Sequence, residues 1–162
     1  MGKPISERLY AETPKGRIYI CCKGCIKDIL ADVDTAYRAA FPKDVVHENK
    51  RCPATGAEIG KEAVDVVLQG HQFRVRDAKA AEYARENSQV VLAKLLDPKL
   101  IDLANEVCPV AGTPVVKNAV VVIDGHLIRL SSPKVLEEIE RDPAKVLAKA
   151  KLLRAQPVAP AK

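Results

Sequence analysis

The sequence predicts an α+β fold in which three β-hairpin-plus-helix repeats pack into one compact molecule. Two long segments of the chain resemble each other, and in each a glycine turn joins two short apolar runs ahead of an amphipathic stretch. Hydrophobic residues make up 48% and charged residues 29% of the 162 positions, which is typical of a globular protein with a buried core.

The internal similarity divides the chain into repeats. Both full copies open with Cys-Pro-x-x-Gly, and Cys108 follows Cys52 by 56 residues. Both then carry a Gly-His turn, in which His126 follows His71 by 55 residues. The same offset aligns three polar residues, Asp32, Asn87 and Asp142. The predicted segments are a truncated first repeat, 1–44, a second repeat, 45–98, a third repeat, 99–155, and a Pro/Ala-rich disordered tail, 156–162.

Each full repeat is expected to contain a β-hairpin. Tight turns are expected at Gln69-Gly70 and Asp124-Gly125, and Asp-Gly between apolar runs is a strong hairpin signal because both central positions can take positive φ. The expected strands are 17–20 in the first repeat, 64–68 and 72–75 in the second, and 119–123 and 126–130 in the third.

A helix is expected after each hairpin. Asp77 and Ser132 stand at N-cap positions ahead of helices over 78–96 and 133–152, and a Pro follows Ser132 at the first helical position. The first repeat predicts a helix over 23–40. Its expected inward face is Ile26, Ile29, Leu30, Val33, Tyr37 and Phe41.

Five cysteines carry the chemistry of the sequence: Cys21, Cys22, Cys25, Cys52 and Cys108. An odd number with two adjacent residues is a poor disulfide framework, since neighbouring cysteines rarely reach the geometry of an unstrained bridge. Reduced thiols or thiolate ligands fit this pattern better.

The Cys21, Cys22 and Cys25 sulfurs would gather over the first helical turn if the helix began near Cys22. A helix N-terminus and the charge of Lys23 favour thiolate, the form that binds soft ions such as Cu(I) and Zn(II). Two other interpretations stay open: small buried residues, or thiol redox chemistry at Cys22 and Cys25.

Three sulfurs suffice for a trigonal Cu(I) site, whereas tetrahedral Zn(II) needs a fourth ligand. Cys52 is the first candidate because it follows the first helix in the chain, and Cys108 and His47 are additional candidates. Taken singly, Cys52 and Cys108 also fit small structural residues at a turn. His71 and His126 occupy equivalent positions and indicate a shared role in the turn.

The Cys-Pro-x-x-Gly openings, the glycine-turned hairpins and the segment Ile18-Tyr19-Ile20-Cys21-Cys22-Lys23-Gly24-Cys25 resemble YHS/TRASH-type metal-binding modules. The resemblance implies treble-clef-like units associated with heavy-metal sensing, trafficking and resistance. It also implies a site built from an early cysteine in the opening and a later pair at the helix start. No single repeat has both halves: the first lacks the opening cysteine, and the other two have Arg76/Ala80 and Ser131/Val135 where the later cluster belongs.

These observations favour a soft-metal-binding protein, a carrier, sensor or storage module with Zn or Cu(I) as its ion. The alternatives are a protein-interaction module with decayed metal sites and a thiol redox sensor. No common catalytic motif is present, so an enzyme is not expected. The net charge is +5, but Lys and Arg are interleaved with Asp and Glu along the chain and aromatic residues make up only 4%, so specific nucleic-acid binding is not expected.

Neither a membrane span nor a signal peptide is visible in the sequence, which favours a cytoplasmic protein. An exported form with a trimmed leader would have the same sequence.

Overall fold

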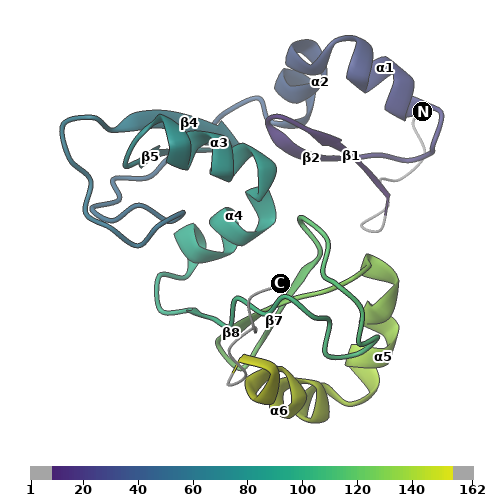
Figure 1. Cartoon of the computed structure of the whole chain (residues 1–162). Helices are drawn as coiled ribbons and strands as arrows, with labels where there is room; N and C mark the ends of the chain where they lie inside the picture. Colours follow the sequence, from purple (N-terminus) through teal and green to yellow (C-terminus); the bar gives the residue numbers. More distant parts are fainter. Residues whose placement is uncertain (1–8, 155–162) are drawn as a thin grey trace, which may run out of the picture. The chain divides into compact units, whose positions relative to one another are not determined.

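The computed structural model describes residues 9–154, in which three small β-sheets alternate with short helices (Figure 1). The predicted α+β class is confirmed. The chain divides into two compact units, residues 1–88 and 89–162. The predicted tail, 156–162, lies outside the described residues, and the predicted repeat boundaries stay a prediction.

The first module is a hairpin followed by two helices. Strands β1 (Tyr10–Thr13) and β2 (Gly16–Tyr19) pair antiparallel, α1 (Cys25–Ala31) packs on β1, and α2 (Val33–Ala40) packs on β2 (Figure 1). The sequence predicted only the second strand. In β1 the inward positions are Ala11 and a threonine, so the strand has too little apolar alternation to be recognised.

The core of this module combines both strands and both helices. Its buried members are Ala11, Ile18, Ile20, Ile29 and Tyr37. Cys25, Ile26 and Phe41 pack against this cluster while partly exposed. Leu30 was predicted to face inward, but its side chain is 54% exposed, because the helix ends one residue later and the inward face changes direction.

The second module has three strands in the order β3-β5-β4 and a helix, α3 (Ala78–Glu86). Strands β4 (Val64–Leu68) and β5 (His71–Val75) form the predicted hairpin, and the two turn residues have φ of 47° and 77°. The two-residue strand β3 (Val45–Val46) pairs parallel with β5 and was not predicted. Asp77 caps α3 as expected, accepting the Ala80 N–H at 2.8 Å.

The second unit repeats this plan. Its elements are most of α4 (Ser88–Leu96), β6 (Ile101–Asp102), β7 (Val120–Ile123), β8 (His126–Arg129), a 3₁₀ turn (Pro133–Val135), α5 (Leu136–Arg141) and α6 (Pro143–Arg154). The sheet order is β6-β8-β7, with β6 parallel to β8, and Asp124 and Gly125 both have positive φ in the predicted turn. Ser132 accepts the Lys134 N–H, which confirms it as an N-cap.

Each of the three long helices predicted from the sequence is broken once. The breaks fall at Asp32, Asn87 and Asp142. Asp32 shows the cause, since it ends α1 and its carboxylate accepts the Thr35 N–H to begin α2. Asp142 accepts the Lys145 N–H in the same way. Within residues 9–154, no helix combines the length and the hydropathy needed to cross a membrane.

Candidate metal centre

The cysteine cluster lies at the corner where β2 gives way to α1. The Cys25 N–H donates to the Cys22 carbonyl and the Ile26 N–H to the Lys23 carbonyl, both at 3.3 Å, so the chain makes a tight turn before the helix. The helix begins at Cys25, two residues after the predicted start at 23. Cys22 therefore lies in the turn rather than in the first helical turn.

The turn brings the three sulfurs together. The Cys22 and Cys25 Sγ atoms are 3.5 Å apart, and those of Cys21 and Cys25 are 3.8 Å apart. All three Sγ atoms lie within 4.8 Å of one another. A search of the described part of the chain for three or more His, Cys, Asp or Glu side chains close enough to share one ion finds these three cysteines.

The electrostatics of the cluster divide its thiols into two kinds. Hydrogen bonds from the Cys25 thiol, from the Cys25 and Gly24 N–H groups and from Cys21 lower the pKa of Cys22. The pKa of Cys25 is raised to about 11, first by its hydrogen bonds with Cys22 and Cys21 and then by burial. Cys22 is thus the sulfur that loses its proton first, and Cys25 is its hydrogen-bond donor.

The cluster is accessible from solvent. Cys22 is exposed, Cys21 and Cys25 are half-buried, and all five cysteines of the chain are free thiols. Cys25 also touches the core of the module, which fixes one side of the site. A surface-exposed group of thiols at these distances can bind a thiophilic ion or form a disulfide.

Cys52, the first candidate for a fourth ligand, is not a member of this group. It is fully buried at the start of a loop in which the Gly56 N–H donates to the Cys52 carbonyl and the Cys52 N–H donates to the Ala57 carbonyl. Burial raises the pKa of its thiol, but hydrogen bonds from the Thr55 hydroxyl and from the Arg76, Thr55 and Ala54 N–H groups outweigh this and lower it. Protein donors therefore surround the sulfur.

Cys108 occupies a matching loop in the second unit. The Cys108 N–H donates to the Thr113 carbonyl, and the Cys108 carbonyl accepts the Gly112 N–H. Burial raises the pKa of this thiol, and hydrogen bonds from the Ala111 N–H, the Ser131 hydroxyl and N–H, and the Val110 N–H lower it below its usual value. We call residues 52–57 and 108–113 the opening loops.

His47, an additional candidate, pairs with another histidine. Its Nε2 lies 2.9 Å from Nδ1 of His71, and both rings are partly buried. Burial and the nearby charge of His47 lower the pKa of His71. The sequence did not reveal this pair because its members are brought together by the unpredicted parallel pairing of β3 with β5. His126, the counterpart of His71, instead contacts the Asp124 carbonyl.

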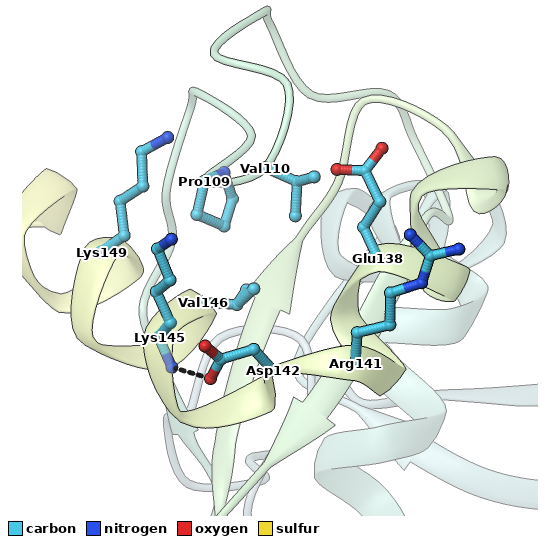
Figure 2. Close-up of a pocket in the computed structure, with 8 residues that line it drawn as sticks. All are labelled: Pro109, Val110, Glu138, Arg141, Asp142, Lys145, Val146 and Lys149. Atoms are coloured by element: carbon cyan, nitrogen blue, oxygen red, sulfur yellow. Dashed lines mark hydrogen bonds between the residues drawn. The ribbon is translucent and has the colours of Figure 1, made fainter.

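The second unit has a surface pocket of about 440 Å³, and Figure 2 shows the residues that line it. Exposed charges of both signs surround a small apolar floor. The lining residues are Pro109, Val110, Glu138, Arg141, Asp142, Lys145, Val146 and Lys149. The Asp142 carboxylate is engaged in capping α6, and all five charged residues are exposed. The pocket therefore offers solvated charges rather than groups prearranged for one ligand.

Comparison of the chain with protein-family models, with curated proteins and with solved structures finds no match. The resemblance to YHS/TRASH-type modules stays a prediction.

Proposed function

We propose that the protein binds a soft metal ion through Cys21, Cys22 and Cys25 and acts as a carrier, sensor or store for it. The observation that carries the proposal is the mutual approach of the three Sγ atoms within 4.8 Å. The resemblance of this segment to YHS/TRASH-type modules supports the same function.

The sulfur spacing fits metal ligation. With a metal–sulfur distance of about 2.3 Å, two sulfurs lie about 3.8 Å apart in a tetrahedral site and about 4.0 Å apart in a trigonal one. The Cys21–Cys25 and Cys22–Cys25 pairs, at 3.8 and 3.5 Å, need little movement to reach either geometry. Cu(I) is satisfied by three sulfurs, and Zn(II) would complete its shell with water or a donor from a partner.

Exposure of the site favours exchange of the ion over permanent retention. Cys22 is exposed and the cluster lies in a single surface turn, so an incoming ligand can reach the metal without unfolding the module. We therefore favour a non-catalytic role in which the ion is cargo or signal.

The proposal is tested by metal titration of the reduced full-length protein without oxygen. Cu(I) is added against a chromophoric competitor, and Zn(II) against a fluorescent chelator. We expect one equivalent of tightly bound ion, lost when Cys22 or Cys25 is replaced by Ser. Cys108→Ala is the matched control, because it removes one thiol from the other unit. Equal binding by wild type and the triple variant, Cys21/Cys22/Cys25→Ser, rules the site out.

A second candidate function is thiol redox sensing. It is favoured by the 3.5 Å separation of Cys22 and Cys25 and by the opposite shifts of their pKa values. Oxidation would join the two sulfurs as a disulfide with release of two protons and two electrons to an external acceptor such as a peroxide. A measured reduction potential within the range of cellular thiol pools would support this function, and a dithiol that stays reduced in oxidised glutathione would refute it.

A further inference from the structure

Within residues 9–154, the sheet of the first module has one strand fewer than the sheets of the other two modules. In the second module β3 pairs in parallel with β5, and in the third β6 pairs in parallel with β8. By the 55-residue offset, β5 and β8 correspond to β2. Among residues 9–154, the strand that pairs with β2 is β1, so the other edge of β2 has no strand beside it. An exposed strand edge is a template for pairing with another chain.

In the complete modules an asparagine extends the pairing beyond the short parallel strand. The Asn49 amide donates to the Arg74 carbonyl at 2.8 Å and accepts the Arg74 N–H at 3.0 Å. Asn105 makes the same pair of bonds with Arg129, at 2.7 and 2.9 Å. The residue at this position in β2 is Tyr19, so its main-chain N–H and carbonyl face the edge where such an amide would bind.

The start of the β2 edge is already covered within the first unit. Gln69 donates its N–H to the Lys15 carbonyl, and its side-chain carbonyl accepts the Arg17 N–H, both at 3.0 Å. The first of these bonds reproduces the one that Val45 makes to the Gly70 carbonyl at 2.7 Å. Gln69 therefore stands in for the first residue of the additional strand. The part of the edge left for a partner is the part nearest the cysteine cluster.

The complete modules also show where a docked strand would lead. The opening cysteine comes three residues after the asparagine, and its sulfur accepts a main-chain N–H from just beyond the hairpin. For Cys52 the donor is Arg76, the residue after β5, and for Cys108 it is Ser131, the second residue after β8. Cys21 is the counterpart of Arg76 and Ser131 at the 55-residue offset. A sulfur delivered in the same geometry would lie beside the Cys21 N–H, next to the three thiols.

We propose that the open edge of β2 and the cysteine cluster form one docking surface for an extended segment of a partner protein with an Asn-x-x-Cys-Pro sequence. The segment adds parallel to β2, its asparagine binds the main chain of Tyr19, and its cysteine becomes the fourth sulfur ligand of the metal. This inference rests on the proposed metal site.

The test uses a synthetic peptide as the partner segment. A labelled copy of residues 101–114 contains Asn105 and Cys108 in the required spacing. Its binding to the reduced full-length protein is measured by fluorescence anisotropy, with and without equimolar Zn(II). Elemental analysis first establishes whether the protein holds the zinc before peptide is added. Peptides with Asn105→Ala and Cys108→Ser are the matched controls and leave the folding of the protein unchanged.

The copied peptide is expected to bind the zinc-loaded protein, and each substitution should weaken binding by about tenfold or more, since each removes direct bonds. A zinc-loaded protein that does not bind the peptide, or binds the Cys108→Ser peptide equally well, overturns the inference and leaves the metal site intact. A protein that takes up no zinc or copper refutes the proposed function itself, and the inference falls with it.

Discussion

Removing one buried hydroxyl, by Tyr37→Phe, tests how the first module is joined to the hairpin of the second. The Tyr37 side chain is fully buried. Its hydroxyl accepts the Gly70 N–H at 2.8 Å and donates to the Asp44 carboxylate at 3.0 Å. Burial raises the pKa of Tyr37 to about 12, so the hydroxyl keeps its proton and remains a donor at neutral pH. One oxygen therefore ties the β4–β5 turn to the end of α2.

The expected loss follows from these two bonds. A neutral hydrogen bond contributes about 1 kcal/mol net, and one to a charged group about 1.5–3 kcal/mol. Asp44 keeps its bond from Arg38 at 2.9 Å, which reduces the second contribution. The Gly70 N–H, in contrast, is left buried without its acceptor. We expect Tyr37→Phe to lower the free energy of unfolding by about 2–3 kcal/mol.

Urea denaturation followed by circular dichroism measures this difference, provided that the slope against urea is unchanged. Tyr19→Phe is the control, because Tyr19 is 37% exposed, and we expect a change within about 0.5 kcal/mol. A double-mutant cycle with Asp44→Ala should give a coupling energy of about 1–2 kcal/mol. If Tyr37→Phe is as stable as the wild type, or the cycle shows no coupling, the reasoning about this junction is wrong.

Two further predictions concern titratable groups. Burial and His47 lower the pKa of His71 below 6.5, so below this pH the unfolded chain binds a proton that the folded protein resists. The free energy of unfolding should therefore be unaffected by His71 above pH 6.5 and should decrease as the pH falls below it. Urea denaturation on both sides of this pH should show a smaller decrease for His71→Gln than for wild type, while His126→Gln should behave like wild type. In the metal-free protein, iodoacetamide should alkylate the exposed Cys22, with its lowered pKa, before Cys25, whose pKa is about 11. Peptide mapping measures the order of alkylation. Equal rates for the two thiols in the folded protein would contradict the assignment of Cys25 as hydrogen-bond donor and Cys22 as acceptor.

The elements that the sequence predicted are those specified by residues close together in the chain. Both hairpin turns follow from a glycine between two short apolar runs, and the caps at Asp77 and Ser132 follow from side chains that bond N–H groups two or three residues on. The cysteine cluster belongs to the same class, because five consecutive residues contain all of it. Local geometry decided each of these features.

The features missed from the sequence depend on partners far away in the chain. Strand β3 has only two residues and acquires its conformation from β5, some 25 residues later. The pair of His47 with His71 follows from that pairing and has no signal of its own in the sequence. The helix break at Asp32 was missed for another reason. Apolar periodicity continues through it, and only the capping bond to Thr35 separates the helices.

The local origin of the cluster also bears on what a bound metal does for the protein. A ligand stabilises a fold only to the extent that it binds the folded chain better than the unfolded one. Cys21, Cys22 and Cys25 remain within five residues of one another even when the chain is unfolded, so the unfolded state would also chelate an ion that the folded cluster binds. To link two segments far apart in the sequence, the metal would need a fourth ligand from another part of the chain, and the described cluster includes no such ligand. A metal bound at this corner would therefore contribute little to the fold, which accords with the proposed role of an ion that is carried and passed on.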